Sequence, residues 1–347
     1  MFKKSAYIAV ILLHCAGCTN MLQTKPTFNT IVNNADFQKA FHDRKIQLIA
    51  PASAAEPAVI EQLKTTTHLN INVPDNLIEK NIIFHANSDE NRFQQLKNAL
   101  YDKSNSTVIW TLRGGYGSAR LIDYLSQCPK PKTEKFFIGS SDITALHLFL
   151  SQQWGWRTIH GAGLASILNP NQDPQNFERI ATIVSNSKKT LTLAPLTPLN
   201  KAACNTKKIT GRITGGSLSI IQTSIGTSWQ IQTAGKILFL EEVGEKGYRI
   251  DRTLNHLKQA GLLKEVRGII LGQFIMSNAL EPSESSAIAE TIRVAIERFA
   301  KDTEVPVFKN DQFGHGLTNY PIVYNAKSEI IVSEMPSEFT WVMHLED

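Results

Sequence analysis

The sequence predicts an α/β fold with an N-terminal domain built on a parallel sheet and a C-terminal domain of mixed strands and helices. Over residues 45–185, short apolar segments alternate with segments of helical period. This βαβα order is typical of a Rossmann-like or flavodoxin-like sheet with helices on both faces. The length of 347 residues suits two domains. Hydrophobic residues make up 42% of the chain and charged residues 19%, which excludes a disordered or fibrous protein.

The N-terminal domain is predicted to begin with a strand over residues 46–50 that leads into a helix from Glu56. A helix over residues 88–101 follows from apolar residues at helical spacing after Ser88, a residue type that caps helices. The other elements predicted here are strands over 81–84, 107–112 and 136–139, a strand ending at His160, and helices over 116–125 and 143–153.

The periodicity lapses between residues 186 and 206, a segment rich in Lys, Thr and Asn that contains two prolines. This segment is predicted to be a linker. The C-terminal domain then covers residues 207–347. Its predicted strands are 236–240, 268–271, 328–332 and 339–343, and its predicted helices are 217–225, 250–260 and 285–299.

The first 18 residues resemble a bacterial lipoprotein signal. Two lysines precede an apolar run over residues 6–13, which is too short to span a membrane. Residues 15–18 resemble a lipobox, in which the thiol of Cys18 is acylated; an ordinary secretory signal is the alternative. We expect an exported, periplasmic protein anchored in the lipid bilayer through Cys18, at the outer membrane because Thr19 follows, with a tether over residues 19–44.

Charge and cysteine content exclude other classes of protein. The net charge is +5, and Lys and Arg form no block longer than a pair, so we expect no nucleic-acid partner. Cys128 and Cys204 lie 76 positions apart without a CxxC motif, so we expect no metal site. Two free thiols are the expectation, and a disulfide between them in an oxidising compartment is the alternative.

A first motif, residues 138–144, takes a buried strand into a helix through Gly139 and two serines. A serine at such a corner points away from the sheet, and the N–H groups of the next turn face whatever it attacks. Ser140 or Ser141 is therefore a candidate nucleophile. A plain helix cap by serine and Asp142 explains the motif equally well.

A second motif, residues 113–118, places glycines directly after a predicted strand. Glycines let the backbone approach a ligand closely, and N–H groups at the start of a helix bind anions. The motif suits an oxyanion or a substrate carboxylate, whereas neither phosphate-binding glycine pattern is met. A structural tight turn is the alternative.

A third motif lies in the C-terminal domain. Glu241 and Glu242 end an apolar strand, and His315 lies between two glycines. A buried carboxylate that orients a histidine, and a histidine that deprotonates a serine, form a complete nucleophilic relay. A histidine in this setting is more often a simple loop residue. His160, at the end of a predicted strand, is the main rival and a possible pocket residue.

Together these motifs resemble the serine LD-carboxypeptidases, also called muramoyltetrapeptide carboxypeptidases. Five ordered segments carry the resemblance: RGGYGSARL at 113–121, SDIT at 141–144, GGSL at 215–218 with IGT at 225–227, LFLEEVGEKGYRIDRTL at 238–254, and GHGLTN at 314–319. The chain departs from the family at Ser140, where an aromatic residue is usual, and at Ala162, where proline is common.

The resemblance implies a role for each candidate. Ser141 would be the nucleophile, Glu241 the triad carboxylate and His315 the general base. The oxyanion donors would be the N–H of Asp142 and that of Gly114 or Gly115. Arg113 and Arg249 are candidates for holding the substrate carboxylate. The family fold adds a barrel-like sheet in the C-terminal domain, and homodimers without a cofactor are usual.

The resemblance further implies hydrolysis of the L,D bond that releases the terminal D-Ala of murein tetrapeptides, with L,D cross-links as a further target. Two alternatives remain open. One is an immunity-type peptidase that cleaves a peptide-nucleotide antibiotic, and the other is a lipoprotein that binds muropeptides without cleaving them.

Overall fold

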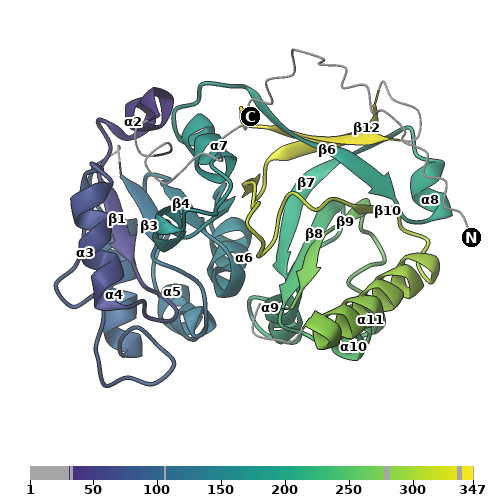
Figure 1. Cartoon of the computed structure of the whole chain (residues 1–347), viewed down its shortest axis with the longest axis horizontal. Helices are drawn as coiled ribbons and strands as arrows, with labels where there is room; N and C mark the ends of the chain where they lie inside the picture. The colour runs from purple at the N-terminus through teal and green to yellow at the C-terminus, as the bar shows by residue number, and fades with distance from the viewer. Residues whose placement is uncertain (1–30, 32–33, 105–106, 277–281, 334–337, 347) are drawn as a thin grey trace, which may run out of the picture.

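The computed structural model describes residues 31, 34–104, 107–276, 282–333 and 338–346. Two domains lie side by side, an α/β domain and a domain built on a closed barrel (Figure 1). The predicted fold class is therefore confirmed. The expected signal over residues 1–18, including Cys18, lies outside the described residues.

The N-terminal sheet has five parallel strands in the order β5-β4-β3-β1-β2. They are β1 (Ile46–Ile49), β2 (Ile71–Asn72), β3 (Val108–Thr111), β4 (Phe136–Gly139) and β5 (Ile159–His160). Every residue of β1 and β3 is buried. Apolar runs without alternation are expected in a parallel sheet, because helices cover both of its faces.

Helices and 3₁₀ turns connect these strands. They are α2 (Ala35–Phe41), α3 (Pro57–Thr66), α4 (Asp89–Leu100), η1 (Ser118–Leu121), α5 (Ile122–Ser126), η2 (Ser141–Ile143), α6 (Thr144–Gln153), η3 (Leu164–Leu168) and α7 (Gln175–Val184). The predicted cap of α4 is present, since the Asn91 N–H donates to the Ser88 hydroxyl over 3.2 Å. The helix predicted over 116–125 is a 3₁₀ turn followed by a short α-helix.

Two predictions for this domain were wrong. Residues 81–84 form no strand, and the edge strand is β2 instead. The apolar side chains that suggested a strand face solvent, with Ile83 75% exposed and Phe84 72% exposed. The tether was also drawn too long, because α2 lies within 19–44 and packs against α7.

The C-terminal barrel has seven strands in the order β10-β6-β13-β12-β7-β8-β9, closed by parallel pairing of β10 with β9. They are β6 (Thr190–Pro198), β7 (Lys208–Ser217), β8 (Lys236–Val243), β9 (Gly268–Ile275), β10 (Val307–Lys309), β12 (Lys327–Val332) and β13 (Phe339–His344). Its helices are α8 (Lys201–Cys204), α9 (Leu218–Ser224), α10 (Gly247–Gln259) and α11 (Pro282–Lys301).

The linker predicted over residues 186–206 was wrong, because it contains β6, a full barrel strand. Leu191, Leu193 and Leu196 of β6 are buried, whereas Thr192 and Ala194 between them are exposed. The alternating pattern of a half-buried strand was hidden by the prolines, which are uncommon within sheets.

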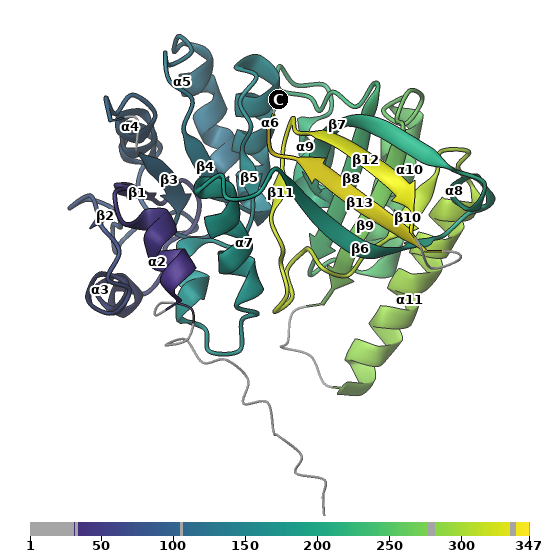
Figure 2. The ribbon, with the colours of Figure 1, turned by 90° about the horizontal axis from the view of Figure 1, so that it is seen from above.

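The C-terminal part of the chain returns to the N-terminal sheet. Strand β11 (Ile322–Val323) pairs antiparallel with β5, and Figure 2 shows it at the boundary of the two domains. Helix α6 packs against β7 and α9 of the barrel domain. The segment between β10 and β11, which carries His315, is therefore fixed to both domains.

Two further expectations concern cysteines and the membrane. Cys128 and Cys204 are free thiols, as predicted. Within the described residues, no helix combines the length and the hydropathy that a membrane span requires.

Candidate active site

Ser141 occupies a sharp corner between β4 and α6. Its φ is +64°, a left-handed conformation that is unfavourable for a residue with a side chain. The corner needs a glycine before it, since a Cβ on Gly139 would lie 2.5 Å from the Thr111 hydroxyl. Such a strained strand-to-helix turn is the geometry of a nucleophile elbow.

The glycine loop after β3 lies directly against this corner. A Cβ on Gly114 would lie 2.7 Å from the Ser141 Cβ and 3.2 Å from its Oγ. Gly115 has a φ of +119° and packs on Ser53. Only glycine allows the loop to come this close to the serine hydroxyl, so the loop backbone borders the position where an oxyanion would form.

Asp142 contributes its backbone rather than its carboxylate to this region. The Asp142 side chain is buried and accepts the Ser118 N–H over 2.8 Å, and its carbonyl accepts the Ser118 hydroxyl. Burial raises the pKa of Asp142, against the hydrogen bonds from Ser118. The carboxylate thus ties the corner to the start of η1, while the Asp142 N–H belongs to the first turn after the serine.

Glu241 and His315 form a hydrogen-bonded pair in the barrel domain. Glu241 Oε2 and His315 Nδ1 are 2.5 Å apart, and Glu241 is fully buried. Burial alone would lower the pKa of His315, but the Glu241 carboxylate, with a smaller effect from Glu242, raises it above the ordinary value. A carboxylate in this position fixes the ring and stabilises its protonated form.

A break in the β8–β9 register between Leu240 and Glu242 lies at this pair. Irregularities of this kind re-aim side chains. Glu242 binds elsewhere, accepting the N–H of Ser219 over 2.7 Å and that of Val243 over 2.9 Å. Burial raises the pKa of Glu242 to about 7, with Glu241 adding to the shift. The two adjacent carboxylates therefore have different hydrogen-bond partners.

Gln273 holds the loop of His315 and was missed in the sequence. Its side chain accepts the Gly316 N–H over 2.6 Å and donates to the Asp311 carbonyl over 2.8 Å. A Cβ on Gly314, whose φ is +135°, would lie 2.7 Å from the Gln273 Cβ. A polar residue within the apolar strand β9 was the available signal for this role.

The structure brings Ser141 and His315 into one open cavity of about 220 Å³ between the domains. Arg113, Gly114 and Gly115 also line it, and so do Ser140 and Ala162, the two positions at which the chain departs from the family pattern. Within the described chain, His315 Nε2 has no hydrogen-bond partner. The ring nitrogen that would accept the serine proton therefore has no competing hydrogen bond. It also has no hydrogen bond from Ser141 in this structure.

His160 and Arg249 do not line this cavity. His160 is fully buried with its ring 5.3 Å from that of Phe239, and burial lowers its pKa well below the ordinary value. Arg249 lies in a separate recess and pairs with Glu245 over 3.5 Å. Both were possible pocket residues in the sequence, and the structure places neither at the pocket.

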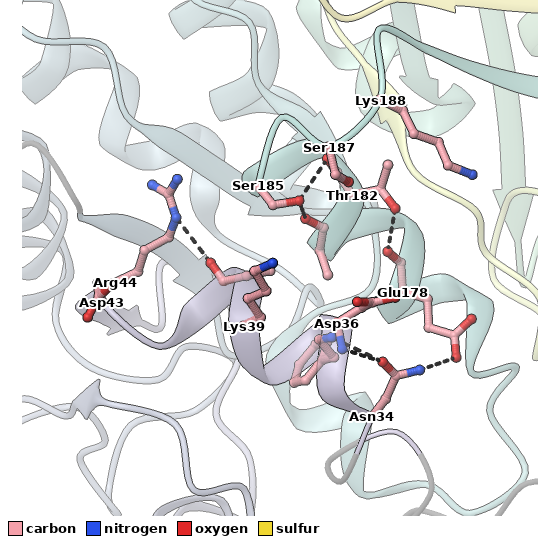
Figure 3. Close-up of a pocket in the computed structure, with 13 residues that line it drawn as sticks. Asn34, Asp36, Lys39, Asp43, Arg44, Glu178, Thr182, Ser185, Ser187 and Lys188 are labelled. Carbon is pink, nitrogen blue, oxygen red and sulfur yellow. Dashed lines mark hydrogen bonds between the residues drawn. The ribbon is translucent and has the colours of Figure 1, made fainter.

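A larger hollow of about 960 Å³ lies between α2 and α7 (Figure 3). Its polar lining includes Asn34, which donates to Glu178 over 3.0 Å, together with Lys39 and Arg44. None of the candidate residues that line the cavity described above lines this hollow. The candidate site is therefore defined by the convergence of serine, histidine and carboxylate, and not by cavity size.

Comparison with known proteins agrees with this architecture. Residues 35–161 match the LD-carboxypeptidase N-terminal domain, and residues 210–330 match the LD-carboxypeptidase C-terminal domain. The chain therefore belongs to the LD-carboxypeptidase family, a family of peptidases.

Individual relatives support this assignment. One relative, from Rickettsia conorii, is provisionally named a carboxypeptidase. It is 47% identical to this chain over an alignment that covers 86% of this chain and 90% of that protein. The murein tetrapeptide carboxypeptidase of Pseudomonas aeruginosa is 30% identical, covering 80% of this chain and 90% of that protein.

Solved structures share the fold. The muramoyltetrapeptide carboxypeptidase of Oxalobacter formigenes superposes with a TM-score of 0.69 at 20% identity, covering 86% of this chain and 98% of that one. The microcin C7 self-immunity protein superposes with a TM-score of 0.67 at 18% identity, covering 87% and 96%.

Proposed function

We propose that this chain is a serine peptidase that hydrolyses the L,D bond before the terminal D-Ala of murein tetrapeptides, with Ser141, His315 and Glu241 as its triad. One observation carries the proposal: the Glu241–His315 pair and the strained Ser141 corner come from different domains and meet at one cavity. The relative from Pseudomonas aeruginosa, named for murein tetrapeptides, supports the substrate class.

In the proposed reaction, the Ser141 hydroxyl attacks the carbonyl carbon of the scissile bond while His315 Nε2 takes its proton. Glu241 stabilises the resulting imidazolium through Nδ1. The N–H groups of Asp142 and Gly115 stabilise the oxyanion. His315 returns the proton to the amine of D-Ala, which leaves, and the carbonyl remains bonded to Ser141 as an ester. A water molecule, deprotonated by His315, then cleaves the ester and regenerates the serine.

Arg113 is the proposed partner of the substrate carboxylate. It lines the cavity with Ser141, and its side chain is exposed. A guanidinium binds a carboxylate through two parallel hydrogen bonds, so it can position the terminal carboxylate of a D-residue.

The test is release of D-Ala from the tetrapeptide, measured enzymatically. Ser141→Ala is expected to lose about 10³-fold or more in kcat. Ser140→Ala removes the neighbouring hydroxyl of the same cavity and is expected to retain at least a hundred times more activity than Ser141→Ala. Ser126→Ala, on α5 away from the cavity, is the control for substitution itself. Release by Ser141→Ala at the wild-type rate would exclude Ser141 as the nucleophile.

We also propose that the chain is exported and tethered to a membrane through acylated Cys18. The proposal is supported by the two N-terminal lysines, the short apolar run and the small residues before Cys18. Two or three acyl chains would anchor the protein firmly, at about 0.8 kcal/mol for each buried CH₂ group.

A further inference from the structure

An exposed aromatic pair lies next to the catalytic cavity and has no role in the proposed reaction. Phe84 is 72% exposed and Tyr116 is 54% exposed, and their ring centroids are 6.3 Å apart with the rings nearly perpendicular. His85 stacks on Tyr116 with the centroids 5.2 Å apart. Large apolar rings gathered at the surface mark binding sites more often than isolated ones do.

The backbone fixes this pair to the glycine loop. Phe84 has a φ of +74°, an unfavourable conformation for a bulky residue, and such strain clusters at functional sites. The Ser53 hydroxyl donates to the Phe84 carbonyl over 2.7 Å and accepts the Tyr116 N–H over 3.1 Å. The same hydroxyl packs against Gly115. One side chain therefore fixes the backbone of both aromatic residues beside the loop that borders Ser141.

The aromatic pair lies within reach of a peptide bound at Ser141. Gly114 contacts Ser141, and Tyr116 follows two residues later, at most about 7 Å along the chain. Tyr116 therefore lies within roughly 10 Å of Ser141, and the Phe84 ring centroid lies 6.3 Å from that of Tyr116. A tetrapeptide cut at its last bond has three residues on the acyl side, which extend about 10 Å.

We propose that Phe84 and Tyr116 form a subsite for the sugar ring attached to the amino end of the peptide in a muramoyltetrapeptide. The proposal rests on the proposed function, since it assigns the part of the same substrate farthest from the cleaved bond. A pyranose has an apolar C–H face that packs on an aromatic ring, and polar groups around its edge. Polar partners are close: a Cβ on Gly117, the residue after Tyr116, would lie 2.4 Å from the His85 ring and 3.0 Å from the Arg92 guanidinium. Asp89 pairs with that guanidinium and also accepts a hydrogen bond from Arg120 over 2.7 Å.

A sugar fits this geometry better than a nucleobase. A flat base is held best between or upon parallel rings, whereas the Phe84 and Tyr116 rings meet at 88° and form a corner. One Tyr116 face is already occupied by His85. A corner of this kind suits a ring with thickness and with substituents on its edge.

The test compares two substrates, the free tetrapeptide and the N-acetylmuramoyl tetrapeptide, by kcat/KM. The wild type is expected to prefer the sugar-bearing substrate about tenfold, through KM. Phe84→Ala is expected to reduce this preference to near unity. Ile83→Ala is the matched control, because Ile83 is 75% exposed on the same segment but carries no aromatic ring, and its preference is expected to equal that of the wild type.

Several results would overturn the subsite. Two of them concern kcat/KM: equal values for both substrates in the wild type, or an equal decrease for both substrates in Phe84→Ala. The others are a decrease in Phe84→Ala that dissociation of a dimer explains, and an equal decrease in kcat/KM for a peptidyl nucleotide in Phe84→Ala. Failure of the proposed function is a different result, namely no D-Ala release from either substrate by the wild type. In that case, titration calorimetry of Ser141→Ala with both peptides tests the subsite through binding alone. The subsite requires that the sugar-bearing peptide bind more tightly than the free peptide, and that this difference disappear when Phe84→Ala is added.

Discussion

Gly114→Ala tests how closely the glycine loop and the nucleophile are fitted. The added methyl group would lie 2.7 Å from the Ser141 Cβ and 3.0 Å from the Ser140 carbonyl oxygen. Carbon atoms pack at about 3.5–4.0 Å, so the first contact is short by roughly 1 Å. The Gly114 φ is not in the left-handed region, so alanine is compatible with the backbone. The overlap must therefore be relieved by moving the loop away from Ser141.

A displacement of about 1 Å at a reacting group costs on the order of 10²-fold in rate. We therefore expect Gly114→Ala to lower kcat for D-Ala release about a hundredfold with little change in urea denaturation. Gly155→Ala is the opposite control. Its φ is +71° and a Cβ there meets nothing within 4 Å, so alanine costs only about 1 kcal/mol of backbone strain.

Gly155→Ala should thus lower the free energy of unfolding and leave kcat unchanged. Gly114→Ala should lower kcat and leave the free energy of unfolding nearly unchanged. The assay is steady-state D-Ala release at saturating tetrapeptide, with denaturation followed on the same preparations. If Gly114→Ala kept kcat within threefold of the wild type, the loop would not border the reacting serine as described.

Three further outcomes are expected. Glu241→Gln should lower kcat about 10³- to 10⁴-fold; because it removes the charge that raises the pKa of His315, the acidic limb of the pH–kcat/KM profile should move to lower pH. Glu242 is protonated more readily in the folded state, so its contribution to stability is present below about pH 4.5 and lost as the pH rises through about 7. Between pH 5 and 8, the free energy of unfolding measured with urea should therefore fall by about 2–3 kcal/mol less in Glu242→Gln than in the wild type. Cys18→Ser should move the protein from the membrane fraction to the soluble fraction of cells and abolish incorporation of labelled fatty acid, and unchanged fractionation would contradict the anchor.

Local signals sufficed for the central strands of the N-terminal sheet. A parallel strand buried on both faces is a continuous apolar run, so β1, β3 and β4 were predicted within a residue of their bounds. The run over residues 81–84 failed because its apolar side chains face solvent instead of the core. Sequence pattern cannot separate a buried strand from an exposed apolar segment of the same composition.

The barrel was harder to predict, because its closure depends on pairings between distant segments. Strand β6 pairs with β13 and β10, which lie more than 100 residues away in the chain. Its prolines and threonines gave the composition of a linker. Strand β11 is only two residues long and exists because β5 offers an unpaired edge.

At the site, the motifs indicated which residues matter but not how they are supported. The sequence placed His315 between two glycines, and the structure identifies the Gln273 side chain as the group that these glycines contact. His160 is a residue of the expected type in the expected region, yet it is fully buried and does not line the cavity. Tertiary packing decides whether a side chain at a strand end faces the cavity or the core. The sequence alone therefore left the position of His160 open.

The most direct measurement of the central claim is intact-protein and peptide mass spectrometry after reaction with a serine-reactive fluorophosphonate. The account predicts a single adduct on Ser141, absent in Ser141→Ala, present in Ser140→Ala, and formed about 10³-fold more slowly or worse in His315→Ala. An adduct on another serine, or equal labelling with and without His315, would contradict a nucleophile and a base that act together across the two domains.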